Sequence, residues 1–349
     1  MTANTLYHRL QRYRTLQSDR VYSLPVVVLM PHSACNCRCV MCDIWKDNAN
    51  RKQLTEQDIL SLLITLRKLG TQTVLMSGGE ALLNPSFFHF CEILARYNIK
   101  VSLLSTGITL KKHAPMIVKH VRDVTVSLDG SETMHDTIRG IPGACARLAA
   151  GVRELREQDP YYPLSARTVI HRLNFRDWPN IIRSAIEWEL NRISFLPADV
   201  SSHAFNREIL WSDQRQQELL LDLQELKELK EIIEDIIAKH IDNNPCPVIS
   251  ENAERLRRIH QYYAAFHGLN AFPYKKCNAP WVSVVVEADG TVRPCFFHPS
   301  VGNIRQSSLE ELLNSEESVR FRKKLDTNKD PICVKCVCYL HLSPGKNIV

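Results

Sequence analysis

The sequence lacks the features of fibrous, disordered and membrane-spanning chains. It has only 12 glycines and 17 prolines among 349 residues, and 23% of its residues are charged, which excludes collagen-like, low-complexity and globally disordered chains. No segment approaches the roughly 18 uninterrupted apolar residues of a membrane span. Residues 1–25 also lack the apolar centre and small-residue cleavage site of a secretory signal. We therefore expect a folded, cytoplasmic protein of about two domains.

Long runs of one charge sign are absent as well. Lysine and arginine outnumber aspartate and glutamate by 44 to 38, a mild excess that suits anionic small molecules as well as nucleic acid. Cysteine, in contrast, is abundant, with 12 residues. In a reducing compartment a cysteine-rich chain more often binds metal or performs redox chemistry than forms disulfides. We therefore expect a metal-binding or redox protein.

Short apolar, β-branched segments recur along the first two thirds of the chain, separated by segments with helical spacing. Their continuous apolar character is typical of strands that are buried on both faces. The alternation predicts a parallel sheet, as a partial barrel or a doubly wound sheet, with its chemistry at the carboxyl ends of the strands. The predicted strands are Val26–Met30, Thr73–Met76, Val101–Leu104, Val124–Leu128, Ala166–Ile170 and Arg192–Leu196.

The pattern changes after residues 212–240, which read as one long helix. Pro245 and Pro247 mark a boundary there. Asp289-Gly290 then predicts the turn of a hairpin, and a helix over 308–325 precedes a terminal cysteine loop. We expect three parts: an N-terminal extension over residues 1–24, an α/β barrel over 25–242 and a small α+β domain over 243–349.

Three cysteines follow the first predicted strand with C-x3-C-x2-C spacing: Cys35, Cys39 and Cys42. A short loop of this kind can wrap three thiolates around a single inorganic centre. Cubane iron–sulfur clusters are usually held by four thiolates, so a site with three cysteines leaves one iron free to bind another ligand. The residues alone leave two alternatives open, a zinc site completed by Cys37 and reactive surface thiols.

This motif resembles the radical SAM superfamily, whose hallmark is the same spacing in the loop after the first strand of a partial (βα)6 TIM barrel. The resemblance implies that the three cysteines hold a catalytic [4Fe-4S] cluster whose open iron is chelated by S-adenosylmethionine (SAM). Cys37 is then a spectator, and Met41 takes the position that contacts the adenine. Gly78, Gly79 and Glu80 are similar to the family's GGE motif, which receives the methionyl ammonium, although a tight turn alone also explains the two glycines. The resemblance implies further SAM contacts at the ends of later strands: Thr106 after the third strand, Ser127 and Arg139 at the sugar and carboxylate of the cofactor, and Leu196 at the adenine.

A second set of cysteines lies near the C-terminus and resembles the SPASM and twitch extensions of the same superfamily. Its spacing is most similar to the shorter twitch type, which holds one auxiliary [4Fe-4S] cluster. A structural zinc ribbon is the alternative. The resemblance implies four ligands, with Cys338 able to replace one of them: Cys277, Cys295, Cys333 and Cys336.

Two departures from the family favour a small-molecule substrate over a peptide. Phe296 follows Cys295, where the sulfatase-maturing branch of these enzymes has a catalytic aspartate. The 25 residues before the first strand also leave no room for the peptide-recognition module of many peptide maturases.

Our leading hypothesis is a radical SAM oxidoreductase of the dehydrogenase type. The resemblance implies reductive cleavage of SAM to a 5′-deoxyadenosyl radical, which abstracts hydrogen from a small polar metabolite. His298 or His171 would accept a proton, and a flavodoxin or ferredoxin would donate electrons; no membrane or nucleic-acid partner is expected. The alternatives are a radical SAM peptide maturase that forms thioether or carbon–carbon crosslinks and, from another class, a zinc-binding nucleic-acid module.

Overall fold

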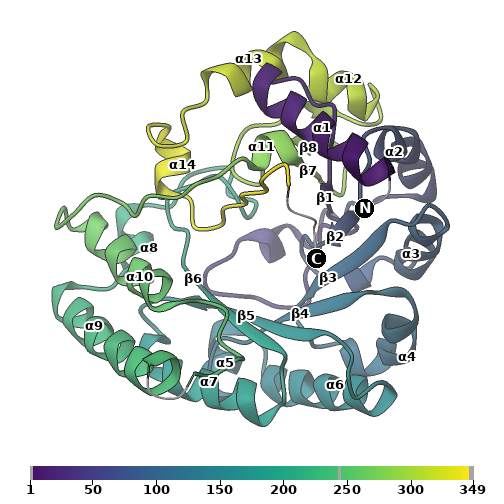
Figure 1. Cartoon of the computed structure of the whole chain (residues 1–349). Coiled ribbons are helices and arrows are strands. Elements are labelled where there is room, and N and C mark those ends of the chain that lie inside the picture. The colour runs from purple at the N-terminus through teal and green to yellow at the C-terminus, as the bar shows by residue number, and fades with distance from the viewer. Residues whose placement is uncertain (1–2, 243–244, 346–349) are drawn as a thin grey trace.

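A computed structural model describes residues 3–242 and 245–345. Its first six strands pair in parallel and in chain order, and they curve into an open barrel (Figure 1). Each strand begins and ends within two residues of its predicted range, and their order and direction confirm the predicted partial barrel. The strands are β1 (Val26–Leu29), β2 (Thr73–Met76), β3 (Lys100–Ser105), β4 (Asp123–Ser127), β5 (Leu164–Ile170) and β6 (Arg192–Pro197).

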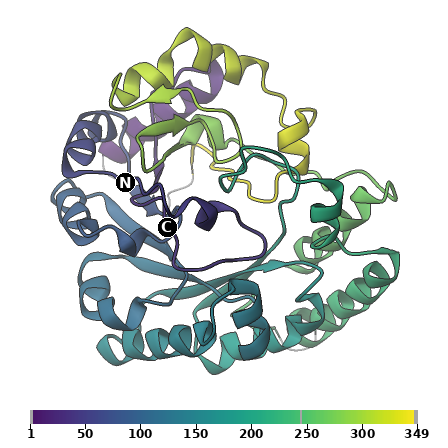
Figure 2. The same cartoon turned by 180° about the vertical axis from the view of Figure 1, so that it is seen from behind.

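Helices cover the outer face of this barrel, as Figures 1 and 2 show. They are α2 (Glu56–Lys68), α3 (Phe87–Arg96), α4 (Leu110–His120), α5 (Glu132–Arg139), α6 (Ala144–Gln158) and α7 (Trp178–Glu187). Val27 and Val74 face these helices and are buried, whereas Val28 and Leu75 on the inner face are only half-buried. The prediction that the strands are buried on both faces is therefore wrong for the inner face, because a cavity lies against it.

The predicted hairpin does not form a sheet of its own. β7 (Ser283–Val286) pairs in parallel with β1, and β8 (Thr291–Arg293) and β9 (Gly302–Asn303) follow antiparallel, so the described residues contain one sheet of nine strands. Gly290 has a φ of +87° in the turn between β7 and β8, where another residue would be strained. The predicted domain boundary at residue 243 lies outside the described residues, and the sheet joins strands from both sides of it.

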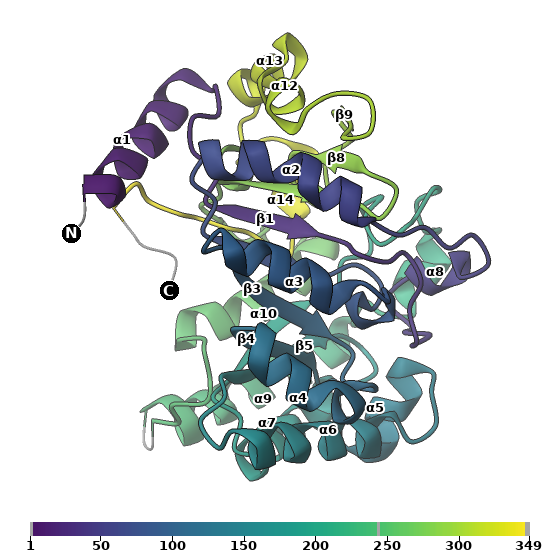
Figure 3. The same cartoon turned by 90° about the vertical axis from the view of Figure 1, so that its right-hand side faces the viewer.

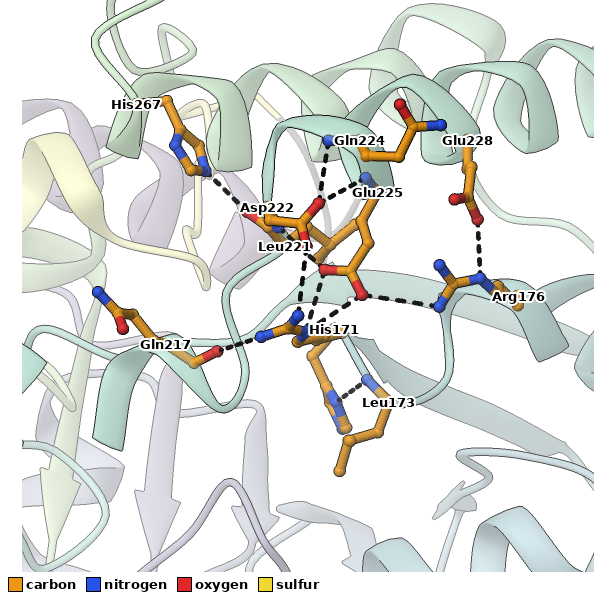
Figure 4. A network of polar contacts seen from close by, with 11 residues as sticks. His171, Leu173, Arg176, Gln217, Leu221, Asp222, Gln224, Glu225, Glu228 and His267 are labelled. Atoms are coloured by element: carbon orange, nitrogen blue, oxygen red, sulfur yellow. Dashed lines mark hydrogen bonds and ion pairs between the residues drawn. The ribbon is translucent and has the colours of Figure 1, made fainter. Parts of the chain in front are cut away.

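The single helix predicted over 212–240 is wrong. The structure has α8 (Asp213–Gln217) and α9 (Leu223–Ile237) instead. Asp222 causes the break, because its carboxylate accepts hydrogen bonds from two backbone N–H groups of the first turn of α9 (Figure 4). The Glu225 carboxylate accepts the backbone N–H of Asp222 in return, at 2.9 Å. This capping box starts a new helix.

The helix predicted over 308–325 is likewise two helices. They are α12 (Leu309–Asn314) and α13 (Glu316–Lys324), and the side chain of Ser315 caps the second by accepting a backbone N–H. No helix among the described residues combines the length and apolar character needed to cross a membrane. The remaining helices are α1 (Ala3–Ser18), α10 (Ala253–Phe266), α11 (Ala279–Val282), α14 (Pro331–Lys335), 3-10 helices at Ile44–Asp47, Ala81–Leu83 and Phe175–Asp177, and a π-helix at Ala238–Asp242.

The first helix of the chain, α1, lies beside elements from its C-terminal third (Figures 1 and 3). Trp281 of α11 donates a hydrogen bond from Nε1 to the carboxylate of Asp19 at 2.8 Å. The backbone N–H of Val21 donates to the side chain of Asn314 at 2.7 Å. The segment after α1 is therefore fastened to the C-terminal helices.

Candidate active site

The first cysteine motif, in residues 35–42, follows β1 at the carboxyl end of the barrel. The backbone N–H groups of Arg38 and Val40 donate to carbonyls at the end of α5 over 2.8 and 3.0 Å. The side chain of Asn48 accepts the N–H of Cys35 at 3.0 Å and donates to its carbonyl at 2.9 Å. The loop is therefore fixed to the barrel through its backbone, which leaves the cysteine side chains available as ligands.

Side chains of this loop share a small apolar core. Cys37, Cys39 and Met41 are buried, and the other two motif cysteines are half-buried. Arg207 donates to the carbonyl of Met41 at 3.2 Å and forms a buried ion pair with Asp199 at 2.6 Å. Met41, predicted to contact the adenine, thus also links the loop to the segment after β6.

Positive charge lies beside the sulfur of Cys39. Arg139 is buried, forms an ion pair with Asp129, and donates from Nη1 to the Cys39 sulfur at 3.4 Å. The pKa of Cys39 is lowered, first because the Cys37 thiol donates a hydrogen bond to it and then because of the Arg139 charge, and these causes outweigh burial. A lowered pKa favours the thiolate, which is the form that binds metal.

The sulfurs of the loop influence one another's pKa values. The Cys37 thiol interacts with Cys35 and Cys39, which raises the pKa of Cys37. Burial, followed by the neighbouring Cys39 and Cys35 sulfurs, raises the pKa of Cys42. The donor set fits an iron–sulfur cluster held by three thiolates. The structure also places Cys37, the expected spectator, inside the same group.

Two glycines after β2 pack directly against the cysteine loop. Gly78 has a φ of +107°, and a side chain on Gly79 would lie 2.2 Å from the carbonyl oxygen of Ala34. The backbone N–H of Glu80 donates to the same carbonyl at 3.0 Å. The turn and its close approach to the loop therefore require both glycines, independently of any contact with SAM.

Glu80 is fully buried, and its carboxylate binds protein donors. Oε2 accepts hydrogen bonds from the Ser105 hydroxyl at 2.9 Å and from the Thr106 N–H and hydroxyl at 2.8 and 2.7 Å. Burial raises the pKa of Glu80, and these hydrogen bonds oppose that shift. The Thr106 hydroxyl also lies 2.9 Å from the side-chain oxygen of Asn36 in the cysteine loop. Two predicted SAM contacts, Glu80 and Thr106, are thus in direct contact with each other.

The other predicted SAM contacts gather at the same rim of the barrel. Ser127 is the last residue of β4, and Leu196 lies near the end of β6; both are half-buried. Arg139 ends α5, beside the cysteine loop. The carboxyl ends of parallel strands meet at one edge of a sheet, so this placement agrees with the predicted contacts without testing them.

A cleft of about 130 Å³ adjoins this rim. Its walls include Met30 and Gly79 from the barrel, Phe205 from the segment after β6, and Phe296 from the segment after β8. The rings of Phe205 and Phe296 are 5.0 Å apart, edge to face. Phe205 has a φ of +61°, which costs about 1–3 kcal/mol for a residue of this size. The surrounding packing therefore holds this ring at the cleft against backbone strain.

The second cysteine set lines a separate cavity of about 280 Å³. Burial raises the pKa of Cys295 to about 11, and it also raises the pKa of Cys333 and of Cys336. Lys275 donates from Nζ to the carbonyl of Val334 at 2.8 Å, which joins two of the segments. Thiols from three distant segments around one space fit a cluster with four thiolate ligands. All five cysteines contribute to the wall: Cys277, Cys295, Cys333, Cys336 and Cys338.

Arg167 was not among the site residues predicted from the sequence. This residue of β5 lies in the wall of the second cavity, and its Nε donates to the Ser194 hydroxyl at 3.2 Å. Within the described part of the chain, nothing accepts a hydrogen bond from its Nη atoms. The sequence does mark this residue, because Arg167 is the only charged residue in the predicted strand Ala166–Ile170.

Neither predicted proton acceptor lies in the wall of the first cleft. His171 is fully buried, accepts the N–H of Leu173 at 3.3 Å (Figure 4), and has a pKa lowered to about 4 by burial. His298 lines the second cavity, and burial lowers its pKa as well. The role of proton acceptor stays a prediction for both residues.

Comparison with known proteins identifies two domains. The profile of the Radical SAM superfamily matches residues 29–185, and that of the SPASM iron–sulfur cluster-binding domain matches residues 277–337. The chain therefore contains a radical SAM domain followed by a SPASM domain. These domains imply SAM and [4Fe-4S] clusters as cofactors.

Three curated proteins illustrate the range of its relatives. The AdoMet-dependent heme synthase of Methanosarcina barkeri is 25% identical over 84% of this chain and 82% of its own length. The subtilosin biosynthesis protein AlbA of Bacillus subtilis is 22% identical over 88% of this chain and 65% of its own. The PqqA peptide cyclase of Rhodopseudomonas palustris is 24% identical over 49% of this chain and 46% of its own.

A solved structure shows the same fold. SuiB of Streptococcus suis, bound to the precursor peptide SuiA, superposes with a TM-score of 0.65 at 15% identity, over 95% of this chain and 74% of that one.

The names of these relatives contradict the expectation that a small molecule is favoured over a peptide, since one is a peptide cyclase and another belongs to the biosynthesis of the bacteriocin subtilosin. Phe296 and the short N-terminal segment were weak grounds for it. Phe296 bears only on the proton acceptor of one branch of the family, and the N-terminal segment bears only on an accessory module. Neither feature reports on the substrate itself.

Proposed function

We propose that this radical SAM enzyme modifies a precursor peptide by forming a thioether or carbon–carbon crosslink. The observation that carries the proposal is the position of Phe296, which belongs to the walls of both the cleft and the second cysteine cavity. A peptide side chain held in the cleft would contact Phe296, which also lines the cavity of the second cysteine set. The names of two relatives, AlbA and the PqqA peptide cyclase, support a peptide as the substrate.

The first cysteine set would hold the cluster that binds SAM. When bound, this cluster and SAM supply a radical that removes a hydrogen atom from a substrate carbon. The chain's own contribution is to orient the substrate and to keep water away from it. Phe205 and Phe296 do this by presenting aromatic surface to the cleft.

The second set would hold one auxiliary [4Fe-4S] cluster. We assign its ligands as Cys277, Cys295, Cys333 and Cys336. Two observations support leaving Cys338 out: its side chain is exposed, and the SPASM match ends at residue 337. The Cys336 sulfur lies 2.9 Å from the backbone carbonyl of Cys338, so the two residues are neighbours in this loop.

A second candidate function is a tetrapyrrole reaction similar to that of the heme synthase relative. It is favoured by the extent of that match, which covers more than four fifths of both chains, whereas the match to the PqqA peptide cyclase covers about half of each. The two functions differ in the substrate and share the cysteine sites.

Anaerobic turnover separates the two functions. The reconstituted protein is incubated with SAM, dithionite and either a short peptide encoded beside its gene or iron-coproporphyrin III. We expect formation of 5′-deoxyadenosine and loss of two hydrogens from the peptide by mass spectrometry. Conversion of iron-coproporphyrin III with an unchanged peptide would support the second candidate instead. The Cys35→Ala, Cys39→Ala, Cys42→Ala triple variant is the control, and 5′-deoxyadenosine formed by it would contradict both functions.

A further inference from the structure

A histidine lies among the cysteines of the second cavity. The Nε2 atom of His298 is 3.3 Å from the Cys333 sulfur and 3.8 Å from the Asp330 carboxylate. The residue is only 3% exposed and forms part of the cavity wall. The ligand atoms of these three residues all lie within 4.8 Å of one another, which brings His298 into contact with the cluster site.

Both neighbours of Nε2 are hydrogen-bond acceptors. The Asp330 oxygen already accepts the backbone N–H groups of Ile332 and Cys333, at 3.0 and 2.9 Å. A cysteine that binds metal is a thiolate and has no hydrogen to donate. Nε2 therefore forms a hydrogen bond with these neighbours only when it carries the hydrogen of the ring. The nearer of the two acceptors is the sulfur of Cys333.

Contacts away from the cysteines fix the orientation of this ring. Phe321 of α13 packs edge to face against the imidazole, with ring centroids 5.0 Å apart. Arg293 of β8 donates to the backbone carbonyl of His298 at 3.2 Å. Because the protein fold holds the ring in place, the direction of Nε2 does not depend on a bound metal.

We propose that His298 is a positioning residue that donates a hydrogen bond from Nε2 to the Cys333 thiolate of the auxiliary cluster and so raises the reduction potential of that cluster. The reduced cluster carries more negative charge, and an N–H directed at a ligand sulfur stabilises it. The inference rests on the proposed function, which includes this cluster. It gives His298 a role different from the proton acceptor predicted from the sequence.

The test uses the Cys35→Ala, Cys39→Ala, Cys42→Ala background, in which the auxiliary cluster is the only one left. The midpoint potential is measured by a redox titration followed by EPR. We expect His298→Leu to shift the potential downward and His298→Gln, which keeps an N–H donor, to restore most of the shift. His89→Leu is the matched control, because His89 is half-buried on α3, far along the chain from the second cysteine set, and contacts Glu56. Its potential should equal that of the background.

Three other outcomes would overturn the proposed role of His298. His298→Leu with full iron content and an unchanged potential would show that the hydrogen bond has no effect. Loss of the cluster in both His298 variants would make the residue a ligand or a structural support. As a readout that needs no variant, pulsed EPR of the reduced cluster in H2O and D2O should detect an exchangeable proton, and its absence would also overturn the proposal. A background protein without an iron–sulfur spectrum would instead contradict the proposed auxiliary cluster itself.

Discussion

The guanidinium of Arg139 lies 3.4 Å from the sulfur of Cys39, 100 residues away in the sequence. The same guanidinium is paired with Asp129, which is fully buried. The first cysteine loop is thus coupled to a buried ion pair just after β4. The charge of the Cys39 thiol therefore depends on Arg139, a residue that the family resemblance predicted to contact SAM.

Replacing Arg139 with methionine tests this coupling. We expect the Arg139→Met protein to lose the iron of the first site, because the thiolate of Cys39 loses its positive neighbour. We also expect a loss of about 3–5 kcal/mol in stability, because the Asp129 charge stays buried without its partner. Iron analysis and thermal melting measure the two effects. The Asp129→Leu, Arg139→Met double variant should regain stability without regaining iron, and full iron content in the single variant would refute the coupling.

A methyl group at residue 79 should damage the cysteine loop. In Gly79→Ala the added carbon would lie 2.2 Å from the Ala34 carbonyl, so the loop must move. We expect SAM cleavage to fall at least tenfold while the far-ultraviolet circular dichroism stays unchanged. Gly345→Ala is the control, since an added carbon there meets nothing within 4 Å. Equal SAM cleavage in the two variants would show that the close approach is not needed.

Glu251 should make stability depend on pH. Its Oε2 is buried with no partner among the described residues, and burial raises the pKa of its carboxyl from 4.5 to about 7. Between these values the folded protein keeps a proton that the unfolded chain has released. The contribution of the Glu251 carboxyl to the free energy of unfolding is therefore fully present below pH 4.5 and is lost as the pH rises through 7. In total it amounts to a change on the order of 3 kcal/mol. We expect Glu251→Gln to melt near the wild type at pH 5 and above it at pH 8; a constant difference would contradict the shifted pKa.

The ligand assignment of the second set predicts opposite results for two neighbouring cysteines. We expect Cys338→Ser to keep the auxiliary cluster and Cys336→Ser to lose most of it, as measured by iron and sulfide content in the background without the first motif. The pair is well matched, since the two residues are close together in the same loop. A cluster lost in Cys338→Ser and kept in Cys336→Ser would reverse the assignment.

The break before α9 predicts a purely structural effect. Asp222→Ala removes the capping box and should lower the melting temperature of the protein, whereas Asp222→Asn keeps a capping oxygen and should lower it less. Neither change should alter SAM cleavage. Thermal melting and the 5′-deoxyadenosine assay check both expectations, and unchanged melting in the alanine variant would show that the cap contributes nothing.

The barrel could be predicted from sequence because its strands are short apolar segments with sharp limits. The cysteine spacing and the glycines after β2 also lie in single short segments, so local reading finds them. The breaks at Asp222 and Ser315 were missed because an apolar stripe continues across them, although the Asp222-x-x-Glu225 signature was there to read. The left-handed backbone of Phe205 and the contact of Arg139 with Cys39 have no local signal, because tertiary packing alone produces them.

The parallel pairing of β7 with β1 has a mechanical consequence. The strand that leads into the first cysteine motif is an interior strand only while the C-terminal segment is present. In a chain that ends before residue 277, β1 would be an edge strand with unpaired backbone N–H and C=O groups. Such an edge promotes aggregation. The same pairing places β7, which follows Cys277 in the chain, beside β1, which precedes the first cysteine motif, so the fold of each cysteine segment depends on the other.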